Sequence, residues 1–435
     1  MKKKLLYDTH ERPPFMQMII LAFQHVFAMF GATILVPILV NKAAGAQVMS
    51  ISTALLASGI GTLLYLLCTK GKSPVFLGSS FAFITPVVLA YTKDGISGFA
   101  TGIITVGLIY ILVSFIIKKI GKAWIDKLLP PVVIGPMIMI IGLSLAPNAI
   151  SQIGLTEGLF YWKDFLVAFV SFAVTVAVAI YGKGFYKVIP FLIGMISGYI
   201  LSICLGIVDF TAVKDASILE LPRVLIPFKD YTFSIVGMIT IAPLAIVSIT
   251  EHIGDHMALS SIIGKNLIKD PGLDKTLLGD GLATTVAGLI GGPANTTYGE
   301  NTSVVGMSRV ASTWVIGTGA IIAIIMSFFG IIAAIFSTIP SPVLGGVSMI
   351  LYGFISINGL KVLIENKVDF NDLKNVIIAS TMLLLGLGGA IVTISGGDLS
   401  VSITGMSLSA VVGIILNAIL NPSKEKLDEE EYVDL

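Results

Sequence analysis

A few ionisable side chains stand inside long apolar runs, where a charge is expensive. Glu251 lies in the stretch VSITEHIGDHMALS, and Glu300 lies in TYGEN. A charge at the bilayer centre costs at least ~2.5 kcal/mol on insertion scales, so such residues are normally paired or functional. Glu251 and Asp255 are four residues apart and therefore share one face of a helix. Two carboxylates close together in a low dielectric favour keeping a proton on one of them, which suits a proton carrier.

Histidines accompany these carboxylates. His252 and His256 follow on the same stretch, and His25 lies in the first apolar run. Each polar residue also has a structural interpretation: Glu300 could cap a half-helix N-terminus, and Glu251 could be the partner of His25 or His252. His256, near the inner end of its span, is expected to be solvated or interfacial, whereas for His25 a hydrogen-bonded core position and a proton path stay open.

The composition indicates whether the chain folds in water or in a membrane. Its 435 residues are 55% hydrophobic and 12% charged, with a mean hydropathy of +0.95, against roughly 25% charged residues in a soluble domain. The chain is therefore an integral membrane protein, without a basic surface for nucleic acid. Cys68 and Cys204 have no metal-ligand spacing and are expected to be small core residues. The absence of P-loop, zinc and GxSxG motifs argues against an enzyme.

The chain divides at its Lys, Pro and Gly clusters into fourteen pieces, on the basis that a helix needs about 20 residues to cross the hydrocarbon. The predicted fold class is an all-α polytopic membrane protein with fourteen transmembrane spans, of which the third and tenth are short and polar. The tail at 422–435 is expected to be disordered. The predicted spans are 15–40, 50–68, 76–92, 98–118, 130–149, 164–181, 188–208, 232–258, 276–292, 298–312, 313–338, 342–363, 374–394 and 405–421.

The basic residues predict the orientation, because cytoplasmic loops collect Lys and Arg. With the N-terminus inside, all but six of the 27 Lys and Arg residues fall on the inner side. The six outer ones are Lys42, Lys93, Lys163, Lys214, Arg223 and Lys229. The pattern predicts a multi-pass protein of the cell (inner) membrane with both termini in the cytoplasm.

The two short polar spans resemble each other. GSSFAFITPVV at 78–88 aligns with NTTYGENTSVV at 295–305, an offset of 217 residues. Weaker echoes link QH at 24–25 with EH at 251–252, and PVVIG at 131–135 with PVLGG at 342–346. Three matches in the same order indicate two homologous halves of seven spans each. Because seven is odd, the halves enter the membrane from opposite sides, which is a 7+7 inverted repeat.

In transporters built this way, substrate binds near the bilayer midplane, where broken helices point half-helix N-termini at the ligand. Short extended segments are therefore expected to break spans 3 and 10. The backbone N–H groups of Phe81 and Gly299 would be available as donors, since lipid offers them no partner. The hydroxyl residues there are expected either to line a cavity or to serve packing. They are Ser79, Ser80, Thr296 and Thr297.

Long strings of the sequence resemble the nucleobase-ascorbate transporter family, most of all its bacterial uracil permeases. The strings are QHVFAMFGATILVP at 24–37, GSSFAF at 78–83, EHIGDH at 251–256, NTTYGEN at 295–301 and GGVSMILYG at 345–353. The resemblance covers nearly the whole chain. It implies a core domain of spans 1–4 and 8–11 (1–128 and 232–338) and a gate domain of spans 5–7 and 12–14 (129–231 and 339–421), often in a homodimer.

The resemblance also implies a site between these domains, where carboxylates accept the ring N–H groups of a nucleobase and backbone N–H groups donate to its carbonyl oxygens. The implied substrate-binding residues are Glu251, Glu300, Phe81, Gly299, Tyr298 and Tyr352. The coupling ion would be the proton, without a metal or organic cofactor. The implied proton-coupling residues are Glu251, Glu300, Asp255 and His25.

The predicted function is import of uracil by proton symport. Uracil presents two N–H donors and two carbonyl acceptors, which carboxylates and backbone amides complement. A symporter for xanthine or another purine stays open, because purine-transporting relatives often show Gly-Asp where this chain has Gly254-Asp255. An anion transporter of the same architecture is a further alternative, which the two carboxylates disfavour. A purely structural membrane protein leaves the buried carboxylates unexplained.

Overall fold

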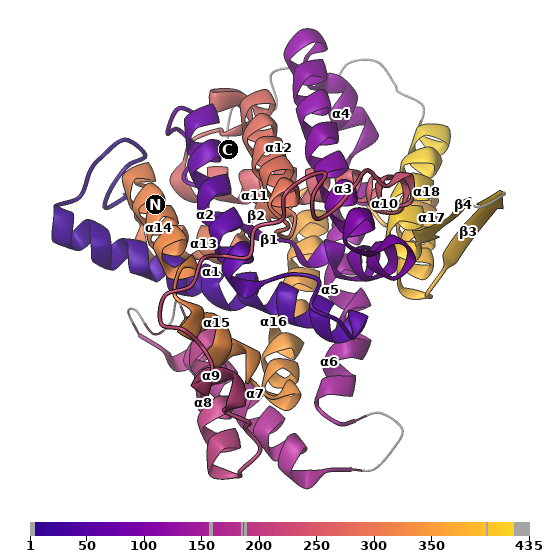
Figure 1. Cartoon of the computed structure of the whole chain (residues 1–435). Coiled ribbons are helices and arrows are strands. Elements are labelled where there is room, and N and C mark those ends of the chain that lie inside the picture. The colour runs from indigo at the N-terminus through magenta and orange to yellow at the C-terminus, as the bar shows by residue number, and fades with distance from the viewer. Residues whose placement is uncertain (1–4, 156–159, 184–185, 187–188, 397–398, 422–435) are drawn as a thin grey trace.

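The computed structural model describes residues 5–155, 160–183, 186, 189–396 and 399–421. The predicted disordered tail at 422–435 lies outside the described residues. Helices dominate the molecule, and two short strands, β1 and β2, lie near its centre (Figure 1).

Within its described residues, the first half of the chain supplies one central strand and nine α-helices. The elements are α1 (Phe15–Ala44), α2 (Ile51–Cys68), β1 (Leu77–Ser79), a 3-10 turn (Phe81–Phe83), α3 (Ile84–Ile120), α4 (Ala123–Leu128), α5 (Pro131–Ser144), α6 (Ala146–Gln152), α7 (Trp162–Tyr181), α8 (Pro190–Cys204) and α9 (Thr211–Lys214).

The second half supplies the other central strand, a hairpin and the remaining helices. The elements are α10 (Ile235–Ile241), α11 (Leu244–Ile263), a π-helical turn (Ile268–Gly272), α12 (Leu273–Leu289), β2 (Asn295–Thr297), α13 (Gly299–Ser308), α14 (Thr313–Ser327), α15 (Gly330–Ser337), α16 (Ser341–Glu365), α17 (Leu373–Leu387), β3 (Ile391–Gly396), β4 (Leu399–Thr404) and α18 (Gly405–Leu420).

Several apolar helices are interrupted. Asp94 and Gly95 are non-helical inside α3, with φ of +56° at Gly95, so the chain turns between the predicted third and fourth spans. A bend of 42° separates α10 from α11 at Pro243, which cannot continue the hydrogen-bond ladder. A second bend, of 80°, separates α14 from α15. The breaks shorten many of the expected continuous spans.

The number of membrane crossings follows from length and apolarity. Among the described residues, six helices are long and apolar enough to cross a membrane, or eight if each bent pair is one span. Three shorter apolar helices, α8, α17 and α18, add to this set. The chain is thus a multi-pass membrane protein, and the count of fourteen spans stays a prediction.

The predicted thirteenth span, 374–394, is wrong at its end. The helix α17 stops at Leu387, and β3 and β4 form an antiparallel hairpin with Ile391 opposite Thr404. The sequence IVTIS is rich in β-branched residues, which favour extended backbone over helix. The hairpin projects from the edge of the molecule beside α17 and α18 (Figure 1).

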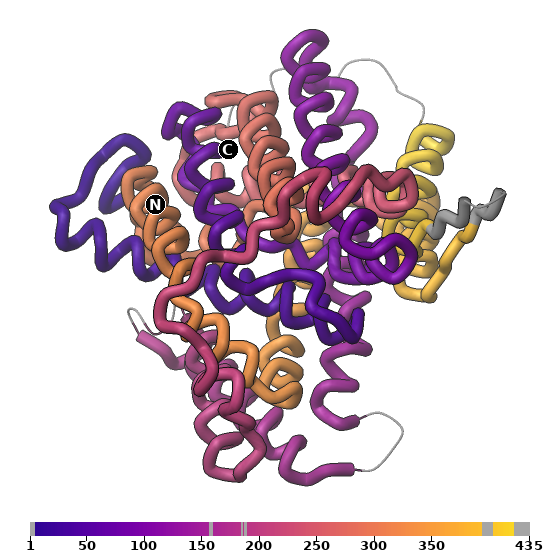
Figure 2. Tube along the Cα trace, viewed as in Figure 1, coloured from indigo at the N-terminus to yellow at the C-terminus, as the bar shows by residue number. Residues whose placement is uncertain are grey.

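The two halves of the chain interlace. Helices α1 and α2 pack against α14, and α3 packs against α10 and α12; the indigo and orange segments lie together in the tube (Figure 2). A second group packs α5 against α16 and α17, α7 against α8 and α16, and α17 against α18. Helix α11 contacts members of both groups, including α3, α12, α5 and α18.

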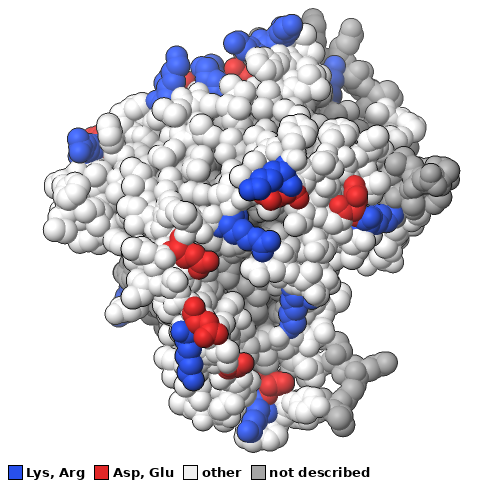
Figure 3. Space-filling view, viewed as in Figure 1, with Lys and Arg blue, Asp and Glu red and all other residues white. Residues whose placement is uncertain are grey.

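Charge is unevenly spread over the surface. In Figure 3, Lys and Arg predominate along the upper edge, whereas charges on the rest of this face are mixed and widely spaced. The same edge in Figure 1 carries the ends of α2 and α12 and the helix α4.

Glycines allow the closest helix contacts. A Cβ at Gly281 of α12 would lie 2.9 Å from the carbonyl oxygen of Gly107 on α3. A Cβ at Gly359 of α16 would lie 2.5 Å from the carbonyl oxygen of Gly135 on α5. Small residues at such crossings let backbones approach, which is the main source of helix association in lipid.

The α5–α16 crossing gives a test of this packing. Gly359→Ala should destabilise the protein by about 1–3 kcal/mol, because the new methyl group overlaps the α5 backbone. The readout is the melting temperature of the detergent-purified protein. Gly353→Ala on the same helix is the control, since a Cβ there meets nothing within 4 Å. Equal melting temperatures for the two variants would contradict the packing argument.

Candidate functional site

The centre of the site is the strand pair β1–β2. The strands are antiparallel, with Gly78 opposite Thr296 and Ser79 opposite Asn295, and the Ser80 amide donates to the carbonyl of Ala294 at 2.9 Å. Short side chains and β-branched threonines suit this extended backbone. Each strand leads into the start of a helix, β1 into the 3-10 turn at Phe81–Phe83 and β2 into α13.

Side chains complete the hydrogen bonding of the strand pair. The Asn295 amide donates to the carbonyl of Ala57 at 3.0 Å, and Thr284 donates to the carbonyl of Asn295 at 2.9 Å. Thr62 accepts from the amide of Leu77 at 3.0 Å. These bonds tie the strands to α2 and α12 and satisfy backbone groups that lipid cannot.

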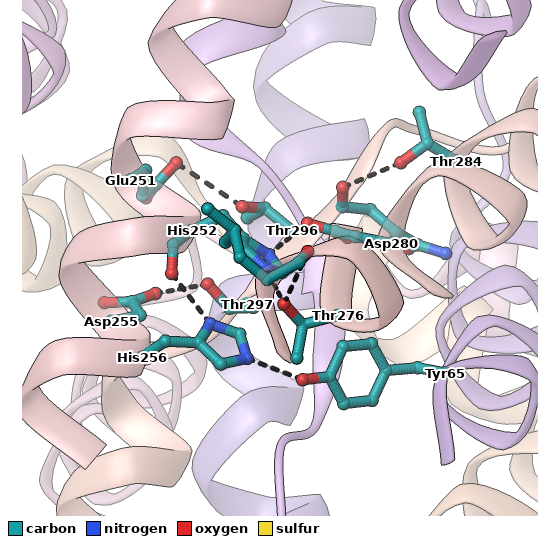
Figure 4. Close-up of polar contacts among 12 residues, drawn as sticks. Tyr65, Glu251, His252, Asp255, His256, Thr276, Asp280, Thr284, Thr296 and Thr297 are labelled. Atoms are coloured by element: carbon teal, nitrogen blue, oxygen red, sulfur yellow. Dashed lines mark hydrogen bonds and ion pairs between the residues drawn. The ribbon is translucent and has the colours of Figure 1, made fainter. Parts of the chain in front are cut away.

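Two carboxylates on α11 face β2. Thr296 lies 3.5 Å from Glu251 between Oγ1 and Oε2, and Thr297 donates to Asp255 over 2.5 Å (Figure 4). A third carboxylate, Glu300, lies in the first turn of α13. Helix α13 packs against α11, which carries Glu251 and Asp255. The structure therefore brings the predicted acidic residues together at the strand pair.

Two helix N-termini begin at the strand pair without a side-chain cap. The residues before them, Ser80 and Tyr298, make no side-chain cap, so the first N–H groups at Phe81 and Gly299 lack that partner. A Cβ at Gly299 would lie 3.9 Å from Asp255 Oδ1 and 3.8 Å from Asn358 Nδ2. Helix N-termini of this kind attract acceptor groups.

Aromatic side chains surround the strand pair on different sides. Phe81 and Tyr352 of α16 are buried and meet edge to face, with ring centroids 5.9 Å apart and planes at 75°. The Tyr298 hydroxyl donates to the carbonyl of Ser79 at 2.9 Å and accepts from Thr33 at 3.1 Å. The hydroxyl of Tyr298 is thus engaged in holding β1, which leaves its role toward substrate a prediction.

The histidines separate into two groups. His25 is buried. The side-chain amide nitrogen of Asn301 lies 3.2 Å from Nδ1 of His25 and donates to the backbone carbonyl of His25 at 3.1 Å. His252 Nδ1 lies 2.9 Å from Asp280 Oδ2. Neither ring is the hydrogen-bonded partner of Glu251, so the structural interpretation of that carboxylate is not supported. Asn301 follows Glu300 directly, which places His25 beside α13.

The expectation for His256 was wrong. Its ring is fully buried, with Nε2 2.6 Å from the Tyr65 hydroxyl and Nδ1 2.7 Å from the carbonyl of His252. The predicted span ended at residue 258, whereas α11 continues to Ile263, so His256 lies about two turns inside the helix. The predicted end of the helix was too early, and His256 was therefore expected at the interface although it is buried.

Asp280 is the acidic residue that the sequence analysis missed. It is fully buried in α12, inside the predicted ninth span. The signal was present, since LLGDGLATT places a carboxylate within an apolar run. Asp280 was overlooked because its partner His252 is 28 residues away.

Apolar helices around a strand pair, with two half-helix N-termini facing carboxylates, define a membrane transporter with broken helices. No group of three or more His, Cys, Asp and Glu side chains that could hold a metal ion is found in the described part of the chain.

Comparisons with known proteins agree with this class. A model described as a permease family matches residues 16–395. The uracil permease of Bacillus subtilis (strain 168) is 45% identical over 98% of this chain and 97% of its own. The uracil permease of Escherichia coli (strain K12) is 43% identical over 97% of this chain and 96% of its own. The chain belongs to this permease family, the nucleobase-ascorbate transporters, and is not an enzyme.

Solved structures show the same fold at low identity. The transmembrane domain of a cyanobacterium bicarbonate transporter, BicA, matches with a TM-score of 0.60 at 17% identity, covering 94% of this chain and 100% of that one. The murine Slc26a9 anion transporter in the inward-facing state matches with a TM-score of 0.68 at 12% identity, covering 94% and 69%.

The anchoring of β2 can be tested at Asn295. Asn295→Ala removes the amide that donates to Ala57 in a site closed to water, so we expect a loss of about 1–3 kcal/mol of stability. Melting in detergent measures the effect. Asn375→Ala, which removes a solvent-exposed amide hydrogen bond at a half-buried residue, should change the melting temperature little; a similar loss in both variants would argue against a special role of the strand anchor.

Proposed function

We propose that this chain is a proton-coupled symporter that imports uracil across the cell membrane. The observation that carries the proposal is the gathering of Glu251 and Glu300 at the strand pair, where the helix starts at Phe81 and Gly299 have no side-chain cap. Carboxylates only accept hydrogen bonds, and backbone N–H groups only donate them. A planar ring with two N–H groups and two carbonyl oxygens complements such a site.

The relatives support uracil as the substrate. Those that match nearly the whole chain at 39–45% identity are named uracil permease or probable uracil permease. The xanthine alternative rests on Asp255 alone. The Thr297 hydroxyl donates to Asp255, so this carboxylate has a protein partner and serves as a support of the site rather than its purine-specific contact.

The charges at the site support proton coupling. The charged neighbours that act on Glu251 are Asp255, Glu300 and Asp280, all of them acidic. Full ionisation of carboxylates so close together is unfavourable in a low dielectric. A proton that enters with the substrate relieves this repulsion, and Glu251 or Glu300 would carry it.

The register of the strand pair supports the inverted repeat. A repeat with an offset of 217 residues relates Gly78 to Asn295 and Ser79 to Thr296. If a two-fold rotation exchanges the two repeats, the Gly78–Thr296 pair must map onto an Asn295–Ser79 pair. That second pair is present in the strand register. The helix contacts follow the same exchange: α2 with α14 corresponds to α12 with α3, and α7 with α8 corresponds to α17 with α18. We therefore retain fourteen crossing segments in two inverted sevens, with both termini in the cytoplasm.

The two packing groups support a division into domains. Helices α1, α2, α3, α10, α12 and α14 would form the core (1–128 and 232–338), and α5, α7, α8, α16, α17 and α18 the gate (129–231 and 339–421). Phe81 and Tyr352 would then meet across the boundary, where substrate binds. A homodimer is the assembly that the family resemblance suggests for the gate.

The carboxylates are tested by Glu251→Gln and Glu300→Gln. Each variant replaces an acceptor-only group by an amide that presents N–H, so we expect uracil affinity to fall at least ~10-fold. Thermal stabilisation by uracil, xanthine, hypoxanthine and simple anions measures binding to the folded protein. Glu365→Gln, at an exposed position, is the matched control. Undiminished stabilisation by uracil in both site variants would contradict the assignment of Glu251 and Glu300 as substrate-binding residues. Stabilisation by anions alone would favour an anion transporter.

Proton coupling is tested in proteoliposomes. Uracil uptake should exceed equilibration when the outside is acidic, and a protonophore should abolish the accumulation without changing binding. Uracil added without a pH gradient should carry protons inward, which a trapped pH dye reports. Accumulation that survives the protonophore would exclude proton symport.

A further inference from the structure

A second polar cluster lies behind the carboxylate face of α11. His252 Nδ1 is 2.9 Å from Asp280 Oδ2, and His252 Nε2 is 3.0 Å from Thr276 Oγ1 (Figure 4). The side chains of His252 and Asp280 are completely buried. The second carboxylate oxygen, Asp280 Oδ1, has no hydrogen-bond partner. A buried acid and base with one unsatisfied oxygen can bind or release a proton with little rearrangement.

Hydrogen bonds show which ring nitrogen of His256 carries a hydrogen. The carbonyl of His252 can only accept, so Nδ1 of His256, 2.7 Å away, must carry a hydrogen. In the neutral ring Nε2 is then the acceptor, and it receives the hydroxyl hydrogen of Tyr65 at 2.6 Å. The Tyr65 hydroxyl also lies 2.8 Å from Ser73 Oγ, a second acceptor for its hydrogen. Tyr65 therefore stabilises the neutral form of His256.

The rings of His252 and His256 lie close together and are tilted against each other. Their centroids are 4.1 Å apart and their planes differ by 30°. Two positive charges at that distance in a buried site repel strongly. A neutral His256 consequently leaves His252, which has the carboxylate partner, as the ring that can hold a charge.

Charged and titratable groups reach this cluster from each neighbouring element. The charge of Asp280 acts on Tyr65 of α2 and Tyr110 of α3. On the side of the proposed site, Glu251 and Asp255 of α11 are within electrostatic range of Asp280 of α12 and of Glu300 of α13. A change of charge at Asp280 and His252 thus alters the field at the proposed substrate site.

We propose that Asp280 and His252 form a second proton-binding site, and that Tyr65, acting through His256, is the residue that confines the proton to that pair. The inference rests on the proposed proton coupling. One proton from water converts neutral His252 beside ionised Asp280 into an ion pair, and its release to water reverses the step. Ser73 is buried, and the residue before it, Lys72, pairs with Asp270 at the surface.

The test uses the small number of histidines, four in the whole chain. In detergent-purified protein labelled with ¹⁵N-histidine, single His variants assign the four ring signals. We expect His256 to keep the neutral form with hydrogen on Nδ1 from pH 5 to 8, while His252 changes its protonation. In Tyr65→Phe, His256 Nε2 loses its donor and becomes free to take a proton, so the His252 transition should move by roughly one pH unit.

Uracil uptake provides the functional readout. The pH of half-maximal uptake should move with the His252 transition in Tyr65→Phe and stay unchanged in Tyr199→Phe, a control that removes a hydroxyl contact of 2.6 Å to Thr338 elsewhere. A His252 signal that keeps one form throughout in the wild type overturns the inference even if Tyr65→Phe does not fold. An unchanged pH profile in a folded Tyr65→Phe also overturns it. Uracil binding and proton-coupled uptake in the wild type, measured in parallel, show separately whether the proposed function holds.

Discussion

The hydrogen bonding of extended backbone inside the membrane is the constraint on which the rest of the structure depends. A strand in lipid has no water to satisfy its N–H and C=O groups, and β1 and β2 solve this by pairing with each other. The pairing brings together segments half the chain apart and places two helix starts beside the same point. Thr62, Thr284 and Asn295 then satisfy what the strands leave open. The polar residues in the apolar runs are a consequence of this geometry.

The same geometry explains why carboxylates are tolerated at the site. Hydroxyls of β2 contact the acids of α11, as Thr297 does with Asp255, and Glu300 lies at the positive end of α13, where the helix dipole favours an anion. These interactions lower the cost of the charges without neutralising them. The remaining repulsion is what a proton or a ring with N–H groups can relieve. The segments that hold the strand pair together are thus also the ones that carry the proposed site.

The broken helices were predictable from sequence because their signals are local. The strings GSSF and NTTYG contain the small and hydroxyl residues that interrupt apolar helices, and Glu251 and Glu300 stand out as rare acids. Longer-range features were not accessible in this way. The burial of His256 depends on where α11 ends and on contact with Tyr65, 191 residues away. The β3–β4 hairpin was missed because an apolar run of β-branched residues fits a helix span as well as a strand by composition.

Helix α11 joins these features, because its sequence repeats acid and base groups with helical spacing on two faces. Glu251 and Asp255 lie toward β2, and His252 and His256, one position later in each case, lie toward α12 and α2. Neighbouring positions on a helix are about 100° apart, so the two pairs cannot reach the same partner, yet they are fixed to one rigid backbone. A shift of α11 against α12 that lengthens the His252–Asp280 contact must also move Glu251 relative to Thr296. The contacts of the buried histidines and the shape of the proposed substrate site are therefore mechanically linked through one helix.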